Sequence, residues 1–387
     1  MRVPFRYHWR SLFRRKGATT LSLVAIALSV AVLVVMLALK NGFESSLAGT
    51  GRPDNLIVLR KGATSEGESG VGRAKAQILA SLPGLARTAN GLPLASPELY
   101  AAVNLERAGG GTTNVAFRGV SKIGRQVEST ATIGEGRWFR PGTQEVVVGK
   151  SLLETLKGAR LGGAIPFNGK DWRVVGILDS PGQAWNSEIW ADVELLVREF
   201  DRQSYNSVIL RVVDPAQIDQ ITQRILGDPR LQMKVQTQPD YFQAQTGRLG
   251  TALGFVGWFL ALIMAIGSAF GATNTLLASL QGRRREIGTL LALGFRPLAI
   301  YIGFLTEAAV LGLIGGALGV ILALPIHGNA LGTTNWATFT EQAFAFRVTP
   351  GIAITAIVFG SLVGLVGGTI PAWRASRLPP TEALRAL

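Results

Sequence analysis

The sequence predicts an α-helical membrane protein with four transmembrane helices and an α+β extracytoplasmic domain inserted between spans one and two. Two observations lead to this class. Four apolar stretches are each long enough to cross a bilayer core, which takes about 20 residues of helix. Residues 41–248, between the first two stretches, carry most of the acidic residues and contain no further apolar run of that length.

The predicted spans cover residues 17–40, 249–282, 298–324 and 348–373, and the apolar stretches of the first, second and fourth lie between charged residues. Glu307 is the one charge inside the third span. The first stretch is too long for the apolar core of a signal peptide, about 7–15 residues. No suitable cleavage site precedes the polar segment that follows it, so we expect this stretch to be retained as a span.

The distribution of charge predicts the topology. The 387 residues include 39 Lys and Arg against 25 Asp and Glu, a net charge of +14, which would suggest nucleic-acid binding in a soluble protein. However, only 17% of residues are charged and the mean hydropathy is +0.29. The segments 1–16, 283–297 and 374–387 hold 13 basic and two acidic residues. Because basic loops stay in the cytoplasm, we expect both termini and residues 283–297 inside, and residues 41–248 outside.

Residues 1–16 alternate basic and bulky apolar side chains. Phe5, Trp9, Leu12 and Phe13 recur at helical spacing, which predicts a cytoplasmic amphipathic helix in the membrane interface, with its arginines at the headgroups. The alternative is a solvated basic leader.

The inserted segment alternates strand and helix patterns at both ends and is rich in hairpins between about 100 and 195. Asn168-Gly169 is a strong hairpin signal, and Asp214-Pro215 suits the start of a helix. Residues 62–72, rich in Gly, Ser and Glu, are predicted to form a mobile loop. We expect the two ends to pack together around a β-rich middle. The predicted strands are residues 55–60, 99–105, 113–120, 145–148, 164–167, 171–178, 207–213 and 232–238, and the predicted helices are residues 73–82, 151–156 and 216–226.

The sequence gives no support for catalysis by this chain. Cysteine is absent, which excludes disulfides and thiolate sites, and His8 and His327 are too far apart in sequence to suggest a metal site or a catalytic triad. Gly149-Lys150-Ser151 resembles the end of a phosphate-binding loop, but the glycine that the motif requires is replaced by Gln144. We therefore predict no catalytic residue, no metal ligand and no nucleotide site.

The basic loop at residues 283–297 contains a short amphipathic pattern. Ile287, Leu290 and Leu291 form an apolar stripe at helical spacing, Gly294 fits a helix stop, and Pro297 fits the first turn of the next helix. Two interpretations remain open on these grounds. The segment is either an interfacial turn helix held by lipid headgroups or a docking helix for a cytoplasmic protein.

Several motifs together resemble the MacB/FtsX/LolE-type ABC transporter permeases, also called mechanotransmission permeases. The resemblance covers both ends and the last third of the chain, and more loosely the inserted domain. Each motif is weak alone, but their combination and order are specific. The motifs lie at residues 9–16, 145–149, 172–178, 285–288, 292–294, 305–309, 315–319, 371–377 and 380–385.

The resemblance implies a bacterial inner-membrane permease that pairs with a second permease, a copy or a paralogue. Two ATPase subunits, which bind ATP and Mg, would dock on the coupling helices and drive movements of the periplasmic domains. No ATPase domain is recognised in this chain, unlike MacB, so we expect a separate ATPase subunit. Glu286 would contact that ATPase or neutralise the positive helix start. The implied coupling residues are Arg284, Arg285, Glu286, Ile287, Gly288, Leu290, Leu291, Ala292, Leu293 and Gly294.

Polar and small residues inside the spans predict contacts between helices. A charge at membrane depth costs about 2.5–3.5 kcal/mol on insertion scales, so Glu307 should bond to a neighbouring helix, with a proton-relay role the less favoured alternative. The second span is longer than a bilayer requires and is predicted to project outward as a rigid helix. Small residues that allow close approach are Gly312, Gly315, Gly316, Gly319, Gly360, Gly364, Gly367 and Gly368.

The sequence therefore predicts the permease subunit of an ABC transporter that exports or extracts an amphiphile, such as a lipid, lipoprotein, glycolipid, drug or peptide, with an adaptor. Residues 325–347 are predicted to form a short external loop, and residues 374–387 a cytoplasmic tail. An FtsX-like regulator of a cell-wall hydrolase is the alternative. A membrane receptor without an ATPase is a third possibility.

Overall fold

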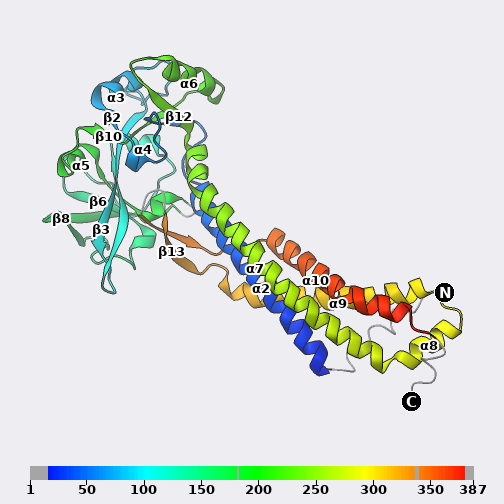
Figure 1. Ribbon diagram of the computed structural model, residues 1–387. Helices are drawn as coiled ribbons and strands as arrows, with labels where there is room; N and C mark the ends of the chain where they lie inside the picture. Colours follow the sequence, from blue (N-terminus) through cyan, green and yellow to red (C-terminus); the bar gives the residue numbers. More distant parts are fainter. Residues whose placement is uncertain (1–15, 181–182, 336–339, 380–387) are drawn as a thin grey trace. The chain divides into compact units, whose positions relative to one another are not determined.

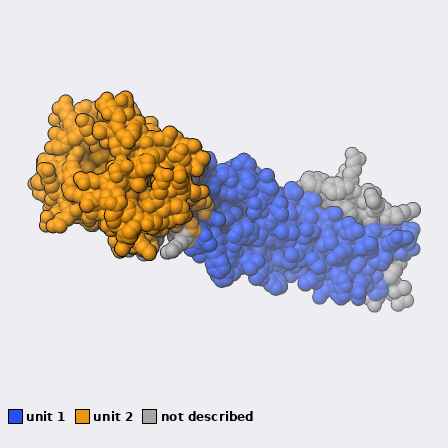
Figure 2. All heavy atoms as spheres, turned by 90° about the horizontal axis from the view of Figure 1, so that it is seen from above, with its two compact units in different colours: residues 1–41, 250–329, 346–387 blue, residues 42–249, 330–345 orange. Residues whose placement is uncertain are grey.

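A computed structural model of the chain describes residues 16–180, 183–335 and 340–379. These residues form two compact units, coloured separately in Figure 2. The helical unit contains residues up to 41, 250–329 and 346 onward, and the inserted unit contains residues 42–249 and 330–345. The predicted helix over residues 1–16 and most of the predicted tail lie outside the described residues.

Among the residues that the structure describes, four long helices are apolar enough to cross a membrane, which confirms the predicted class. They are α2 (Lys16–Ala48), α7 (Gln238–Gly282), α9 (Pro297–Ala323) and α10 (Pro350–Ser376). Figure 1 shows α9 beside α10 and α2 beside α7 in the helical unit. A shared core of Ile26, Val30, Ala265, Val320 and Val363, among others, joins all four helices.

Glycines allow α9 and α10 to pack with their backbones in contact. A Cβ added at Gly312 would lie 2.4 Å from the carbonyl oxygen of Gly360, and one at Gly364 would lie 2.4 Å from that of Ala308. A side chain does not fit at either distance, so the two helices approach closely only because these positions are glycine. Gly316 and Gly368 also face the neighbouring helix.

The other predicted packing glycines contact different helices. Gly315 and Gly319 lie against Ile26 and Ala27 of α2, and Gly367 lies against Ala269 of α7. Each of the eight predicted glycines is buried, and together they pack α9 and α10 on each other and on the remaining spans.

Hydroxyl groups add hydrogen bonds between the spans. Ser22 of α2 donates to the carbonyl oxygen of Gly271 in α7 at 3.1 Å, and Ser268 of α7 donates to that of Ala25 at 2.9 Å. Thr273 of α7 donates to the carbonyl oxygen of Gly367 in α10 at 2.7 Å. These bonds satisfy polar groups in a region where water is scarce.

Ten strands of the inserted unit form one mixed sheet among the described residues, in the order β12-β1-β11-β3-β4-β9-β6-β8-β5, with β7 paired to β8. The strands of this sheet are β1 (Asn55–Arg60), β3 (Ala95–Glu106), β4 (Thr112–Val120), β5 (Ile133–Gly136), β6 (Glu145–Gly149), β7 (Ala164–Phe167), β8 (Lys170–Leu178), β9 (Glu188–Asp192), β11 (Ser207–Arg211) and β12 (Met233–Thr237), and two further short strands are β2 (Val71–Gly72) and β10 (Ser204–Tyr205). The short β2 and β10 pair separately with each other.

Helices flank this sheet in the inserted unit (Figure 1). The α-helices are α3 (Arg73–Ala80), α4 (Gly124–Val127), α5 (Val193–Glu199) and α6 (Ile218–Gly227), and the 3₁₀ turns are η1 (Glu66–Glu68), η2 (Lys150–Leu152), η3 (Ala184–Ser187) and η4 (Pro215–Gln217).

The two ends of the inserted segment pack together, as predicted. β1 lies between β11 and β12 and is antiparallel to both, with Ile57 opposite Ile209 and Gln236. The hairpin at Asn168-Gly169 is also confirmed, because both residues have positive φ, at 52° and 69°. Asp214 accepts a hydrogen bond from the amide of Ala216, as expected for a helix start.

Three local predictions were wrong. The expected helix over residues 151–156 is only the short η2 turn. Residues 62–72 do not form an open loop, because they contain η1 and bury Glu66, which is 2% exposed. Residues 325–347 are more than a loop: after the turn η5 (Leu324–Ile326), β13 (Ala330–Asn335) and β14 (Thr340–Ala345) form an antiparallel hairpin of the inserted unit.

Two helices extend beyond the predicted spans. α2 continues to Ala48 rather than ending near residue 40, and α7 begins at Gln238 rather than near residue 249. α7 is helical through Gly254 and Gly257, where a break would have contradicted the predicted projecting helix. Both glycines lie against α2, next to Lys40 and Met36.

The glycine packing of α9 and α10 predicts a large effect of one methyl group. Gly364→Ala should lower the stability of the purified protein in detergent by about 1–3 kcal/mol, because the methyl group overlaps the backbone of α9. Thermal unfolding measures this change. Gly267→Ala is the matched control, since no atom lies within 4 Å of its added Cβ; equal melting temperatures for the two variants would contradict the packing described here.

Candidate functional site

The loop between α7 and α9 folds into the short helix α8 (Arg284–Ala292). Ile287 and Gly288 are its buried residues. Ile287 packs in an apolar cluster with Leu280 of α7, Phe304 of α9 and Ala372 of α10. α8 is therefore anchored on three of the four long helices of its unit rather than resting only on lipid.

A buried ion pair holds the start of α8. Arg283 immediately precedes the helix, and its Nη1 lies 2.8 Å from Oε1 of Glu307 in α9. Glu307 is 1% exposed, and the Arg283 guanidinium also lies over the ring of Phe304. The expected polar contact of Glu307 thus comes from the residue that begins α8, and the Glu307 carboxylate is compensated inside the protein.

Glu286 lies at the same helix start. Its carboxylate is 3.6 Å from Nε of Arg283, and its side chain is about half exposed. This position suits neutralisation of the basic helix start, one of the two roles that we considered for Glu286, and it leaves part of the side chain accessible.

The exposed side of α8 differs from the predicted apolar stripe. Ile287 is only 2% exposed, so its side chain is used within the chain and is not available to fill a partner's groove. Leu290 and Leu291 are half-buried, whereas Leu293 is 70% exposed. We define the α8 face as the exposed residues of this segment: Arg284, Arg285, Glu286, Thr289, Ala292, Leu293 and Gly294.

Gly294 and Pro297 delimit the segment as predicted. Gly294 has φ +85°, a conformation that favours glycine, and its amide donates to the carbonyl oxygen of Leu291. Pro297 occupies the first turn of α9. The α8 face is consequently held between two defined ends.

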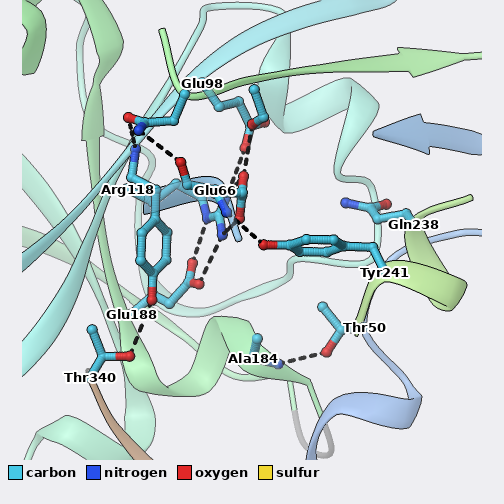
Figure 3. A network of polar contacts seen from close by, with 12 residues as sticks. Thr50, Glu66, Glu98, Arg118, Ala184, Glu188, Gln238, Tyr241 and Thr340 are labelled. Atoms are coloured by element: carbon cyan, nitrogen blue, oxygen red, sulfur yellow. Dashed lines mark hydrogen bonds and ion pairs between the residues drawn. The ribbon is translucent and has the colours of Figure 1, made fainter. Parts of the chain in front are cut away.

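The inserted unit contains a second site, which sequence reasoning missed. Arg118 on β4 is 2% exposed, and its five N–H groups all donate to buried glutamates. Nη1 and Nη2 bind Glu66 at 3.0 and 2.9 Å, Nε and Nη2 bind Glu188 at 2.8 and 3.1 Å, and Nη1 also binds Glu98 at 2.9 Å. We call these four residues the Arg118 cluster (Figure 3).

Aromatic rings enclose the guanidinium. Arg118 lies over the rings of Tyr100 and Trp185 at 5.1 and 5.2 Å. Burial opposes the charge on Arg118, but Glu188, Glu66 and Glu98 outweigh it and raise the pKa of Arg118 well above its usual value. The arginine is therefore a permanent buried cation that requires its carboxylates.

The start of α7 is tied to this cluster. The amide of Glu66 donates to the hydroxyl of Tyr241 at 2.9 Å, and Phe242 packs edge-on against Trp185. At the first residue of α7, the Gln238 side-chain amide donates to Glu128, and its oxygen accepts from Asn55 of β1 at 2.9 Å.

Two other segments reach the same place. Thr340 of β14 is hydrogen-bonded to the hydroxyl of Tyr100 at 3.1 Å, and Phe344 of β14 packs edge-on against Phe43 of α2. Thr50, just after α2, accepts from the amide of Ala184, next to Trp185. α2, α7 and β14 are segments at whose ends the chain passes into the helical unit. Tyr241 in α7, Thr340 in β14 and Thr50 just after α2 all form hydrogen bonds at or beside the Arg118 cluster (Figure 3).

One signal in the sequence indicates this site. Arg118 interrupts an apolar strand, Val115-Ala116-Phe117-Arg118-Gly119-Val120, where an unpaired charge would be very costly. Its partners are not visible in the same way, because Glu66, Glu98 and Glu188 come from three distant segments. Only the folded sheet brings them together.

The four spans and the α/β domain inserted after the first of them agree with the ABC transporter permease class that the sequence motifs resemble. The chain belongs to the family of the MacB-like periplasmic core domain, whose sequence model matches residues 19–227. The model of the FtsX-like permease C-terminal domain matches residues 258–380. The resemblance predicted from the sequence is thereby confirmed, and the family supports a multi-pass inner-membrane protein.

Named relatives share about a quarter of their residues with the chain. It is 28% identical to the macrolide export ATP-binding/permease protein MacB of Bdellovibrio bacteriovorus, over 97% of this chain and 60% of that protein. It is 26% identical to the pyoverdine export ATP-binding/permease protein PvdT of Pseudomonas aeruginosa, over 98% of this chain and 58% of that protein. The chain thus spans about three fifths of the length of these relatives.

Solved structures of two outer domains also match. The extracellular domain of the noncanonic ABC-type transporter YknZ is 16% identical with a TM-score of 0.38, and covers 47% of this chain and 100% of that domain. The periplasmic region of MacB from Actinobacillus actinomycetemcomitans is 13% identical with a TM-score of 0.37, and covers 50% of this chain and 93% of that region.

Glu307 and Glu286 both contact Arg283, but only Glu307 is buried, so we predict that neutralising the two glutamates changes stability by different amounts. Glu307→Gln should lower stability by about 1.5–3 kcal/mol, the usual value of a hydrogen bond to a charged group, and should increase hydrogen exchange in α8. Glu286→Gln is the control and should change both properties little, because its carboxylate is half exposed. Equal effects of the two variants would show that Glu307 does not hold α8.

The Arg118 cluster predicts a severe effect of removing its cation. Arg118→Met should destabilise the protein by about 3–5 kcal/mol and lower its melting temperature by about 10 °C, because three buried carboxylates lose their counter-ion. Arg230→Met is the control, since Arg230 pairs with Asp228 at the surface. A melting temperature of Arg118→Met within the range of this control would contradict the assigned role.

Proposed function

We propose that this chain is the permease subunit of an ABC transporter in which a separate ATPase subunit drives movement of the inserted domain. In this proposal the movement exports or extracts an amphiphilic cargo, and ATP and Mg are bound by the ATPase. The observation that carries the proposal is the α8 face, a basic and partly apolar surface that is presented by a helix anchored on three spans.

The anchoring of α8 suits a docking element. Ile287 fixes the buried side of the helix, and the Arg283–Glu307 pair fixes its start, so a force applied to α8 reaches α9 directly. Leu293, at 70% exposure, is the large apolar side chain that a partner would cover. An interfacial turn helix held only by lipid would not need a buried ion pair at its start.

Charge supports the orientation. Arg284, Arg285 and Arg296 lie in the α8 segment, and Arg374 and Arg377 lie at or just past the end of α10. The positive-inside rule supports a cytoplasmic position for these residues. In the proposed topology α8 lies on the side where ATP is available, and the inserted unit lies in the periplasm.

In this proposal, movements of α2, α7 and the β13–β14 hairpin all act on residues at or beside the Arg118 cluster. Three segments continue from the inserted unit into the helical unit, and each contacts the cluster or a residue beside it. A displacement of α7 therefore acts on the same sheet residues as a displacement of the hairpin or of α2. This arrangement supports the transmission of movement into the inserted domain.

The names of the relatives favour export as the outcome. MacB and PvdT are named as export proteins for macrolides and pyoverdine. We propose a related amphiphilic cargo, a second permease that is either a copy or a paralogue, and a periplasmic adaptor.

The α8 face is tested with one exposed leucine. Leu293→Asp should reduce the amount of ABC ATPase that co-purifies with the tagged chain by roughly tenfold, because a charge replaces an apolar side chain at the contact. Leu226→Asp is the control, since Leu226 is also exposed, at 51%, but lies in the inserted unit. The ATPase is identified by mass spectrometry, and ATP hydrolysis by the complex is measured in parallel.

The result distinguishes the proposed roles of α8. Loss of the ATPase with an unchanged melting temperature supports docking. An unchanged amount of ATPase with Leu293→Asp, and with Arg284 and Arg285 both changed to Glu, would rule out this face as the docking site.

A further inference from the structure

Glu128 is an acid in the interior of the inserted unit that the proposed function does not use. It follows α4 and is 0% exposed. Its Oε1 accepts the side-chain amide of Gln238, the first residue of α7. Its Oε2 is buried without a hydrogen-bond partner among the described residues.

The nearby cations are engaged elsewhere. Arg118 donates its five N–H groups to Glu66, Glu98 and Glu188. Arg211 of β11 donates Nε to Asn55 at 3.0 Å and Nη2 to the carbonyl oxygen of Val127 and the hydroxyl of Ser129. An ionised Glu128 would therefore be a buried charge without its own counter-ion, which is a costly state.

Several charged or titratable side chains surround Glu128, and they belong to η1, β3, β4, β11 and α7. Arg118 and Arg211 favour its charged form, whereas Glu66 opposes it and Glu98 adds a second buried carboxyl with an unpartnered oxygen. Tyr241 of α7 is bonded to the Glu66 amide, and the Arg52–Asp54 pair lies beyond Arg211. Burial is the largest effect and raises the pKa of Glu128 to about 7, against the opposing effects of Gln238 and Arg118.

We propose that Glu128 is a proton-binding residue whose charge state sets how firmly the start of α7 is held in the inserted domain. With the proton bound, the carboxylic acid is neutral and the Gln238 bond closes the junction between α4, β1 and α7. When the proton leaves to solvent, the unpaired carboxylate favours states in which this junction opens to water. The consequence for transport, control of coupling by the pH outside the membrane, rests on the proposed function; the proton-binding step does not.

The direction of the pH effect follows from linkage. In the closed junction Glu128 has a pKa of about 7, whereas in the opened junction its pKa returns to the ordinary carboxyl value of 4.5. Between pH 4.5 and pH 7, therefore, Glu128 holds a proton in the closed junction and loses it when the junction opens. Opening therefore becomes easier as pH rises through this range and levels off above it. Each pKa unit corresponds to a tenfold change, so the opening constant should rise roughly tenfold between pH 6 and pH 8.

Hydrogen exchange of the full-length protein in detergent tests this inference without an ATPase or a cargo. The probe is the exchange of residues 238–246 at pH 6 and pH 8, corrected for the intrinsic pH dependence of amide exchange. We expect the wild type to show the roughly tenfold increase, and Glu128→Gln to exchange slowly and equally at both values. Glu106→Gln is the control and should retain the increase, because Glu106 is exposed and pairs with Lys157.

Two results would overturn the inference: no increase in the wild type, or the same increase in Glu128→Gln. If Glu128→Gln does not fold, Glu128→Asp replaces it. That variant keeps the acid but moves it one methylene away from Gln238, so the pH midpoint of exchange should shift. An unchanged midpoint would also overturn the inference. A failure of ATPase docking at Leu293 would leave these outcomes unaffected.

Discussion

All five N–H groups of the Arg118 guanidinium donate hydrogen bonds to glutamate carboxylates inside the inserted unit, so no water is needed as an acceptor. The transfer of a guanidinium to the protein interior costs several kcal/mol and is offset only when bonding is complete. All five hydrogen bonds form only when η1, β3, β4 and β9 are correctly placed at the same time, because each supplies one residue of the cluster. This single requirement positions Tyr241 and Trp185, and through them the start of α7 and the turn that follows α2.

The helical unit also contains a buried charge that is compensated by an ion pair. Glu307 is buried in a span where an isolated carboxylate is expensive, and the compensating Arg283 lies at the beginning of α8. In each unit, therefore, a connecting element begins beside buried charges: α8 follows the Arg283–Glu307 pair, and α7 reaches the Arg118 cluster through the bond between Tyr241 and the Glu66 amide. Loss of either set of ionic contacts leaves an uncompensated charge. These elements are therefore suited to move together with the residues that bind them.

Features set by local pattern were predictable from the sequence. Long apolar runs gave four spans, the glycine spacing gave the contact faces of α9 and α10, and Gly294 and Pro297 delimited α8. The strands beside Asn168-Gly169 followed from the turn itself. What failed depends on contacts between distant residues: the Gly- and Ser-rich residues 62–72 looked mobile because nothing nearby in the sequence shows that Glu66 binds Arg118.

The α8 segment shows why a correct pattern does not define a surface. Ile287, Leu290 and Leu291 recur at helical spacing, which identifies a helix but not the side that faces the protein. In the structure Ile287 is 2% exposed, whereas Leu293, outside the stripe, is 70% exposed. An amphipathic helix anchored on other helices uses its apolar stripe for the anchor. In the proposed function the ATPase binds the remaining face, where basic groups and one exposed leucine combine. Such a mixed surface suits a contact that forms and separates more than it suits a permanent apolar core.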